Sequence, residues 1–282
     1  MTETTSYASG KILSERRGPI TLITINRPAV RNALDQDAAL GLTRALRAFD
    51  ADPAQNVAIL TGAGGSFCAG ADLKEMAAGA DYVAWAGHPD GPTHAPLSKP
   101  VIAAVAGHAC AGGLGLALWC DIRIGDETAV FGVYSRRWGV PMSDGTTVRL
   151  PRLIGQGRAL EMLLTGRSVN AREALDWGLL NQVVAPGEAL AAAIETASGI
   201  AAVPQIAMRS DRMSAYAQNG QPLDTAIAGE MRLAEEAKRI EAQAGAQRFS
   251  GGAGRHGKPD APSPDVSNRL PDLPGSPGET EK

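Results

Sequence analysis

Residues 98–124 read SKPVIAAVAGHACAGGLGLALWCDIRI, and this stretch predicts a strand, a turn and a helix in succession. The apolar run at 100–105 is rich in β-branched residues and predicts a buried strand. Glycines follow at positions 107, 112, 113 and 115, where an apolar segment with helical character begins. Glycine near a helix start costs about 1 kcal/mol relative to alanine. The stretch therefore predicts an α/β structure and raises the question of why its turn carries so few side chains.

The same alternation of strands and helices runs through the first half of the chain. Residues 19–26 (PITLITIN), 57–61 (VAILT) and 122–124 (IRI) predict further strands, separated by segments with helical spacing. A helix is expected to begin near Asn32, with one apolar face made of Leu34, Ala38, Leu42, Ala45, Leu46 and Phe49. The fold class is therefore α/β.

After residue 140 the periodicity is mostly helical, and only residues 181–184 (NQVV) resemble a strand. Asn170 followed by Glu173 predicts a capping box, and Gly178 the end of that helix. Residues 251–282 are rich in glycine, proline and charge, so we expect a disordered tail there.

The composition excludes several classes of function. The formal net charge is −3, without a long basic run, so nucleic acid is not an expected partner. The first residues lack the apolar core of a signal peptide and no membrane span is evident, so we expect a cytoplasmic protein with no membrane partner. Three cysteines lie in apolar surroundings, which indicates reduced thiols: Cys68, Cys110 and Cys120. The four histidines show no metal-binding spacing, so no metal is expected: His88, His94, His108 and His256.

A second glycine-rich turn occupies residues 61–80 (TGAGGSFCAGADLKEMAAGA), again between a predicted strand and a helical pattern. Backbone N–H groups at such a helix start stabilise an anion. Three uses are open: a phosphate grip, an oxyanion hole, and close packing of helix on sheet. The usual phosphate-binding motifs and the nucleophile elbow are absent.

Four segments in order resemble the enoyl-CoA hydratase/isomerase (crotonase) family over about residues 10–250. They are INRPAVRNAL (25–34), SFCAGADLKEM (66–76), residues 98–124 quoted above, and LPRLIGQGRALEMLLTGRSVNAREALDWGLLNQVV (150–184). The resemblance implies a flexible N-terminus over 1–10, a crotonase-like spiral of ββα units over 11–200 and a C-terminal helical trimerisation region over 201–250. It further implies an acyl-CoA substrate, with CoA part of the substrate and no separate cofactor, and a homotrimer or a hexamer built as a dimer of trimers.

The resemblance also assigns roles to residues. The backbone N–H groups of Ala71 and Gly112 would hold the thioester oxygen, and one such donor contributes roughly 2.7–4 kcal/mol in other enzymes. Contacts to CoA map to Arg27, Arg31, Ala69, Asp72, Leu73 and Lys74. From the residues alone, Asp72 also reads as a helix N-cap, and Arg31 and Lys74 as solvated side chains.

The sequence departs from the family at the two catalytic glutamates, whose positions correspond to Gly115 and Ser135. Water addition needs a base for the water and an acid for the α-carbon. Asp144, on a loop just past the second position, is the candidate acid–base residue, and its alternative interpretation is an N-cap or Asx-turn.

Other interpretations stay open. A Cys110–His108 nucleophile is chemically reasonable, and Arg136, Arg137 and Trp138 are either substrate neighbours or structural residues. The function is then one of three: a hydratase or isomerase using Asp144 or ordered water, an enzyme of other enolate chemistry (hydrolysis, decarboxylation, dehalogenation), or a catalytically silent CoA-binding homologue.

Overall fold

The computed structural model describes residues 3–79, 88 and 91–252. Backbone contacts divide the chain into two compact units, Met1–Ser198 and Gly199–Lys282. The first unit contains every strand found in the described residues and all the residues predicted to form the site.

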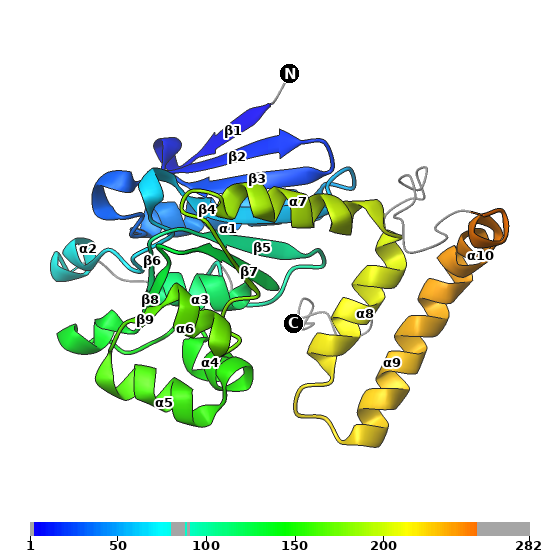
Figure 1. The fold of residues 1–282 in the computed structure, drawn as a ribbon. Helices are drawn as coiled ribbons and strands as arrows, with labels where there is room; N and C mark the ends of the chain where they lie inside the picture. The colour runs from blue at the N-terminus through cyan, green and yellow to red at the C-terminus, as the bar shows by residue number, and fades with distance from the viewer. Residues whose placement is uncertain (1–2, 80–87, 89–90, 253–282) are drawn as a thin grey trace, which may run out of the picture. The chain divides into compact units, whose positions relative to one another are not determined.

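A seven-stranded sheet forms the centre of the first unit, in the order β1-β2-β3-β4-β5-β7-β10 (Figure 1). Its parallel part is made of β3 (Ile20–Ile25), β4 (Val57–Gly62), β5 (Val101–Val105), β7 (Ile122–Asp126) and β10 (Gln182–Val184). These strands agree with the apolar runs of the sequence. The edge is formed by antiparallel β1 (Thr4–Tyr7) and β2 (Ile12–Arg17).

A second, three-stranded sheet consists of β6 (His108–Cys110), β8 (Val130–Gly132) and β9 (Val169–Asn170). Strands of the large sheet are followed in sequence by strands of the small one: β5 by β6, and β7 by β8. Helix α3 (Gly112–Trp119) completes the first of these ββα units. The α/β fold predicted from the sequence is confirmed.

Helices and short 3-10 turns complete the unit. The helices are α1 (Gln36–Ala51), α2 (Leu73–Ala77), α4 (Thr146–Ile154), α5 (Gln156–Thr165), α6 (Ala171–Asp176) and α7 (Ala189–Ala202), the last of which runs past the boundary between the units. The turns are η1 (Ala8–Gly10), η2 (Pro28–Val30), η3 (Ala63–Gly65) and η4 (Tyr134–Trp138). The apolar face of α1 is buried as predicted, with Leu42, Leu46 and Phe49 in the core.

The second unit is helical in its described part. It contains α8 (Gln205–Ala217), α9 (Leu223–Ala237), the π-helical turn η5 (Lys238–Ala242) and α10 (Gln243–Ser250). The Glu241 carboxylate accepts hydrogen bonds from the amides of Ile206 and Ala207 at 3.1 and 2.9 Å and thereby caps the start of α8. Within the described residues no single helix has the length and apolarity to cross a membrane, although the bent pair α7 and α8 passes that test jointly.

Three local expectations need correction. Thr4–Tyr7 lie in the segment expected to be flexible, yet they form a strand because β2 offers them a full antiparallel register. Helix α1 begins at Gln36 rather than near Asn32, since the Asp35 carboxylate accepts from the Ala38 amide at 2.8 Å and ends the extended chain there. Leu34 is buried, but in a β-bridge to Ala71.

The capping box forms only in part. Asn170 accepts from the Glu173 amide at 2.9 Å as predicted, whereas the Glu173 carboxylate turns to Arg167 instead of back to the helix start. Gly178 takes a positive φ just after α6, as expected of the residue that ends a helix. The predicted tail lies almost wholly outside the described residues, which end at 252.

Candidate active site

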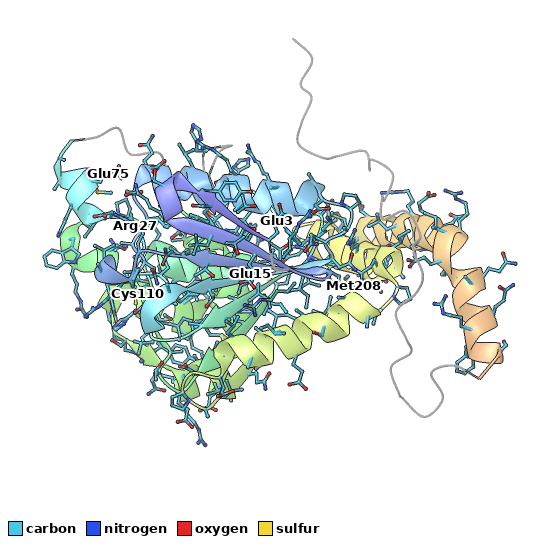
Figure 2. The ribbon with its side chains drawn as sticks, turned by 90° about the horizontal axis from the view of Figure 1, so that it is seen from above. Glu3, Glu15, Arg27, Glu75, Cys110 and Met208 are labelled. Atoms are coloured by element: carbon cyan, nitrogen blue, oxygen red, sulfur yellow. The ribbon has the colours of Figure 1, made fainter. Side chains whose placement is uncertain are left out.

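Three loops meet at one edge of the large sheet. Strands β3, β4 and β5 are parallel, so the segments that follow them, at 26–35, 63–72 and 106–111, all leave from their carboxyl ends. Figure 2 shows Arg27, Glu75 and Cys110, which follow these three strands, at the same end of the first unit. Parallel topology therefore brings together the motifs that carried the family resemblance.

Backbone hydrogen bonds join these loops directly. The Leu34 amide donates to the Gly70 carbonyl at 2.8 Å, which binds the first loop to the second. The Cys68 amide donates to the His108 carbonyl at 2.8 Å, which binds the second to the third. These main-chain hydrogen bonds fix the positions of the turns relative to the sheet.

Asn32 is a residue of this region that the sequence analysis did not single out. Its fully buried side-chain amide donates to the Ala63 and Ser66 carbonyls at 2.8 and 2.6 Å, and its side-chain oxygen accepts from the Arg27 amide at 2.9 Å. Its φ of +58° is one that asparagine tolerates better than most residues. The feature of the sequence that could have pointed to this residue is the asparagine directly before the Ala-Leu pair of the first motif.

The packing around two glycines explains why these turns carry so few side chains. A Cβ atom at Gly113 would lie 1.9 Å from the Cys68 carbonyl oxygen, and one at Gly70 would lie 2.8 Å from the Gly112 nitrogen. Both distances are too short for real side chains. Close packing therefore explains these glycines and places the turn at Gly70 directly against the start of α3.

The amides of Ala71 and Gly112 have no hydrogen-bond partner among the described residues. In the described part of the chain neither N–H donates a hydrogen bond, because the bridge at Ala71 uses the amides of its neighbours. No side chain caps the start of α3. Backbone N–H groups without a partner beside a helix N-terminus can donate hydrogen bonds to an anionic oxygen.

Ala111 holds the start of α3 in an unusual conformation, with φ +49° and ψ −123°. A non-glycine residue in such a region costs of order 1–3 kcal/mol. Its amide donates to the Gly132 carbonyl at 2.9 Å, which fixes the peptide that precedes the Gly112 amide. The strain is thus located at the residue that orients the amide.

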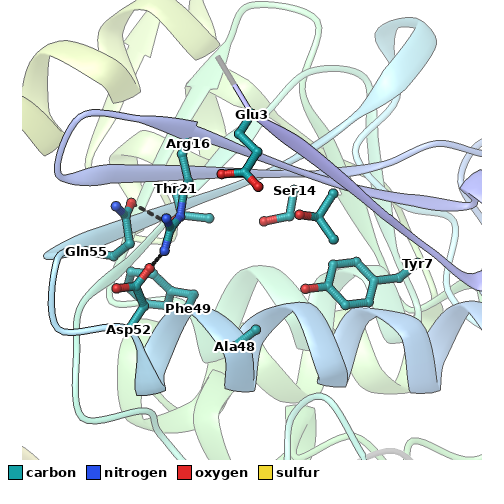
Figure 3. A pocket seen from close by; sticks show the side chains of 10 residues that line it. Glu3, Tyr7, Ser14, Arg16, Thr21, Ala48, Phe49, Asp52 and Gln55 are labelled. Atoms are coloured by element: carbon teal, nitrogen blue, oxygen red, sulfur yellow. Dashed lines mark hydrogen bonds and ion pairs between the residues drawn. The ribbon is translucent and has the colours of Figure 1, made fainter. Parts of the chain in front are cut away.

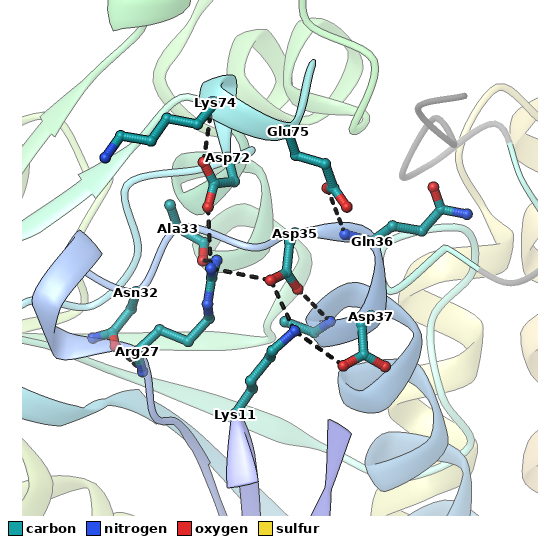
Figure 4. Close-up of polar contacts among 11 residues, drawn as sticks. Lys11, Arg27, Asn32, Ala33, Asp35, Gln36, Asp37, Asp72, Lys74 and Glu75 are labelled. Carbon is teal, nitrogen blue, oxygen red and sulfur yellow. Dashed lines mark hydrogen bonds and ion pairs between the residues drawn. The ribbon is translucent and has the colours of Figure 1, made fainter. Parts of the chain in front are cut away.

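Arg27 is engaged in ion pairs inside the protein (Figure 4). Its guanidinium lies 3.0 Å from the Asp35 carboxylate and 3.1 Å from that of Asp72, and it also donates to the Ala33 carbonyl. Burial raises the pKa of Asp35, but hydrogen bonds from Lys11 and the Ala38 amide, with the nearby Arg27 charge, hold it below its ordinary value. This network connects the first two loops.

Of the residues predicted to contact CoA, some have side chains that bond within the protein and others have exposed side chains. Asp72 caps α2 by accepting from the Lys74 amide at 3.1 Å, so the N-cap interpretation is confirmed for its side chain. Arg31, Leu73 and Lys74 present exposed side chains at this edge, while the Ala69 amide donates to the Arg31 carbonyl at 3.0 Å. Their contact with CoA stays a prediction.

Asp144 lies where a side chain at Gly115 would be. A Cβ atom at Gly115 would meet the Cγ and Oδ2 atoms of Asp144 at 2.5 Å. Gly115 follows Gly112 by three residues, or about 4.5 Å along the helix axis, so the carboxyl is one turn from the Gly112 amide. The loop carboxyl therefore occupies the space that the missing side chain on α3 has left.

The two oxygens of Asp144 have different surroundings. Oδ1 accepts from the Thr146 amide at 2.9 Å, which confirms the Asx-turn interpretation. Among the described residues no hydrogen bond is formed to Oδ2, the oxygen that faces Gly115. Burial raises the pKa of the carboxyl above its ordinary value, although the Thr146 amide and hydroxyl and the Arg149 charge act against this rise.

Ser135 and Cys110 have little capacity for catalysis. The Ser135 hydroxyl is buried and donates to the Met142 sulfur at 3.3 Å. Burial raises the pKa of the Cys110 thiol to about 12, so the thiol stays protonated near neutral pH. The Cys110–His108 nucleophile is thus disfavoured.

The cluster of Arg136, Arg137 and Trp138 is on the surface. The two arginines donate to the carbonyls of Leu163 and Gly166 at 3.1 and 3.3 Å, so they attach η4 to the segment around α5. Trp138 is 70% exposed and is therefore not a core residue of the first unit.

A polar recess of about 270 Å³ lies elsewhere in the unit, between β1–β3 and the end of α1 (Figure 3). It contains the Arg16–Asp52 ion pair and a hydrogen bond of 2.8 Å from the Thr21 hydroxyl to Gln55. None of the predicted site residues lines it. Within the described residues, no cluster of three metal-binding side chains is found.

Comparison with known proteins gives a consistent result. Residues 15–251 match the family model for enoyl-CoA hydratase/isomerase. Enoyl-CoA hydratase EchA19 of Mycobacterium tuberculosis is 38% identical over 239 residues, covering 80% of this chain and 90% of that protein. (E)-Benzylidenesuccinyl-CoA hydratase of Thauera aromatica is 36% identical over 212 residues, covering 74% and 83%. A crystal structure of enoyl-CoA hydratase from M. tuberculosis H37Rv superimposes with a TM-score of 0.82 at 38% identity, covering 86% of this chain and 96% of the other.

The repeating ββα architecture and these structural matches define a protein of the crotonase fold. The chain belongs to the enoyl-CoA hydratase/isomerase family, whose members act on acyl-CoA substrates.

Proposed function

We propose that this protein adds water to the double bond of an enoyl-CoA thioester, with the Ala71 and Gly112 amides as oxyanion hole and Asp144 as its single acid–base group. The observation that carries the proposal is the position of the Asp144 carboxyl, in the space beside Gly115 and one helical turn from the Gly112 amide. The hydratase relatives favour this reaction over the other enolate chemistries.

The amides would act on charge that develops during the reaction. As the thioester oxygen gains electron density, two N–H donors and the N-terminus of α3 stabilise it without reorganising. One such donor contributes about 2.7–4 kcal/mol in other enzymes. This gain exceeds the cost of a glycine at the helix start.

One carboxyl suffices to balance the reaction. The Asp144 carboxylate takes a proton from a water molecule as the water oxygen bonds to the β-carbon, and the π electrons move to the thioester oxygen as an enolate. The protonated Asp144 then gives the same proton to the α-carbon while the thioester carbonyl reforms. The net change is addition of one water molecule.

The environment of Asp144 suits both steps. Its pKa lies above the ordinary value of 3.8, which makes the carboxylate a stronger base and places its protonated form nearer to working pH. Oδ1 is held in the Asx-turn, so Oδ2 is the oxygen that exchanges the proton.

The test uses crotonyl-CoA in D₂O, followed by mass spectrometry. A gain of one D₂O molecule supports the proposal, and we expect Asp144→Asn to lower that rate at least about 10²-fold, because asparagine keeps the turn but transfers no proton. Ser143→Ala, on the exposed neighbour, is the matched control. Full activity of Asp144→Asn would refute the assignment, and deuterium exchange without water gain would favour an isomerase.

The proposal extends to assembly as a homotrimer or hexamer. Large apolar side chains are exposed in the helical region that the resemblance assigns to assembly, where Leu223, Met231 and Phe249 are 73%, 67% and 66% exposed. Exposed apolar side chains that join into one patch commonly mark a protein–protein contact. Light scattering on the purified protein measures the assembly, and a monomeric mass would contradict it.

A further inference from the structure

Two threonine hydroxyls are fully buried and have no hydrogen-bond partner among the described residues: Thr146 Oγ1, in the Asx-turn of Asp144, and Thr93 Oγ1. A buried hydroxyl without a partner costs about 1–3 kcal/mol. Such groups in native proteins commonly bind an ordered internal water. Neither threonine is used in the proton transfer proposed above.

Both threonines belong to one connected cluster around Asp144. The Arg149 guanidinium donates to the Asp144 carbonyl at 3.1 Å and to the Thr93 carbonyl at 2.9 Å, so a single planar group binds both loops. The Thr146 amide binds Asp144 Oδ1. A Cβ atom at Gly145 would lie 2.2 Å from Arg149 Nη1, so the glycine there allows the arginine to reach the turn.

The Thr146 hydroxyl is the member nearest the reacting group. It lies close enough to lower the pKa of the Asp144 carboxyl, against the larger raising effect of burial, yet it makes no hydrogen bond in the described chain. A water molecule bound between this hydroxyl and the carboxyl would form a hydrogen bond to each of them.

We propose that the Thr146 hydroxyl, assisted by Thr93, binds an ordered water against the Asp144 carboxyl and positions it for addition. Thr146 and Thr93 are then positioning residues that take over part of the work of the missing glutamates at Gly115 and Ser135. This inference deepens the proposed hydration reaction and rests on it for its chemical role, but the water site itself is testable separately.

A crystal structure of the full chain at a resolution that shows ordered water tests the site without turnover. We expect a water about 2.7–3.2 Å from Thr146 Oγ1 and within the same range of an Asp144 carboxylate oxygen. Absence of that water, or a Thr146 hydroxyl bonded to a protein carbonyl, overturns the inference even if the enzyme hydrates enoyl-CoA.

Two reactions separate water positioning from acid–base function. Hydration of crotonyl-CoA needs the bound water, whereas α-proton exchange of the saturated thioester butyryl-CoA in D₂O needs only the carboxylate and the oxyanion hole. Thr146→Val is expected to lose about 10²-fold in hydration and to keep exchange within twofold, with a smaller loss for Thr93→Val. Asp144→Asn is expected to lose both reactions.

The controls match the change in shape and polarity. Thr146→Ser keeps the hydroxyl and should restore hydration, and Thr147→Val makes the same substitution at an exposed neighbour. Equal losses of hydration and exchange in Thr146→Val would overturn the positioning role, as would full hydration. Should the wild-type protein perform neither reaction, the proposed function fails, and the crystallographic water still decides the site.

Discussion

Replacing Gly115 by alanine tests the placement of Asp144 most directly. The new Cβ atom would lie 2.5 Å from both the Cγ and Oδ2 atoms of Asp144, where ordinary contact begins at 3.4 Å. The carboxyl must therefore withdraw by about 1 Å, and a displacement of this size in a catalytic group costs about 10²-fold in rate. We expect kcat for hydration to fall by that factor, or about 2.7 kcal/mol in the activation barrier.

Stability should change far less than activity in Gly115→Ala. Overpacking costs about 1–3 kcal/mol, while alanine gains about 1 kcal/mol over glycine in a helix. Urea denaturation measures the net change, and isothermal titration with CoA measures ligand binding, which should be unaltered. Gly199→Ala is the matched control, because a Cβ atom at that position on α7 meets no neighbouring atom within 4 Å. An unchanged kcat in Gly115→Ala would refute the position assigned to Asp144.

Four further outcomes are expected. The rate should rise with pH through an ionisation above 3.8, the ordinary pKa of Asp144, and this limb of the pH–rate profile should vanish in Asp144→Asn. The folded state holds this proton more tightly than the unfolded state, so the stability of the wild-type protein falls as pH rises from 3.8 to the raised pKa. Above this pH range Asp144→Asn should therefore be the more stable protein, which urea denaturation at several pH values measures. Asn32→Ala leaves two carbonyls and one amide without their partner and should lose about 3 kcal/mol or more in denaturant unfolding; a loss below 1 kcal/mol would contradict its role. Ala111→Gly relieves a positive φ and should raise the midpoint of thermal unfolding by a stabilisation of about 1 kcal/mol, whereas a lower midpoint would show that no strain is stored there.

Local pattern was sufficient for the main elements of the sheet. The runs at 19–26, 57–61 and 122–124 became β3, β4 and β7, because buried parallel strands consist of continuous apolar and β-branched residues. The short strands β6, β8 and β9 have two or three residues each, too few for a periodic pattern to appear. Strand β1 was missed for a related reason, since its stability comes from pairing with β2 rather than from its own composition.

By itself the sequence determined the α/β class and the two glycine turns, since each depends on residues that are neighbours in the chain, and its resemblance to the family predicted the departure at Gly115 and Ser135. Only the tertiary structure decided how Asp144 relates to Gly115, because these residues belong to different elements and meet through the folding of the loop onto α3. The same holds for Arg27, whose charge is bound by Asp35 and Asp72, and for the unpartnered hydroxyls of Thr93 and Thr146. Hydrogen-bond partners and burial are properties of the packed chain, and no local pattern of residues records them.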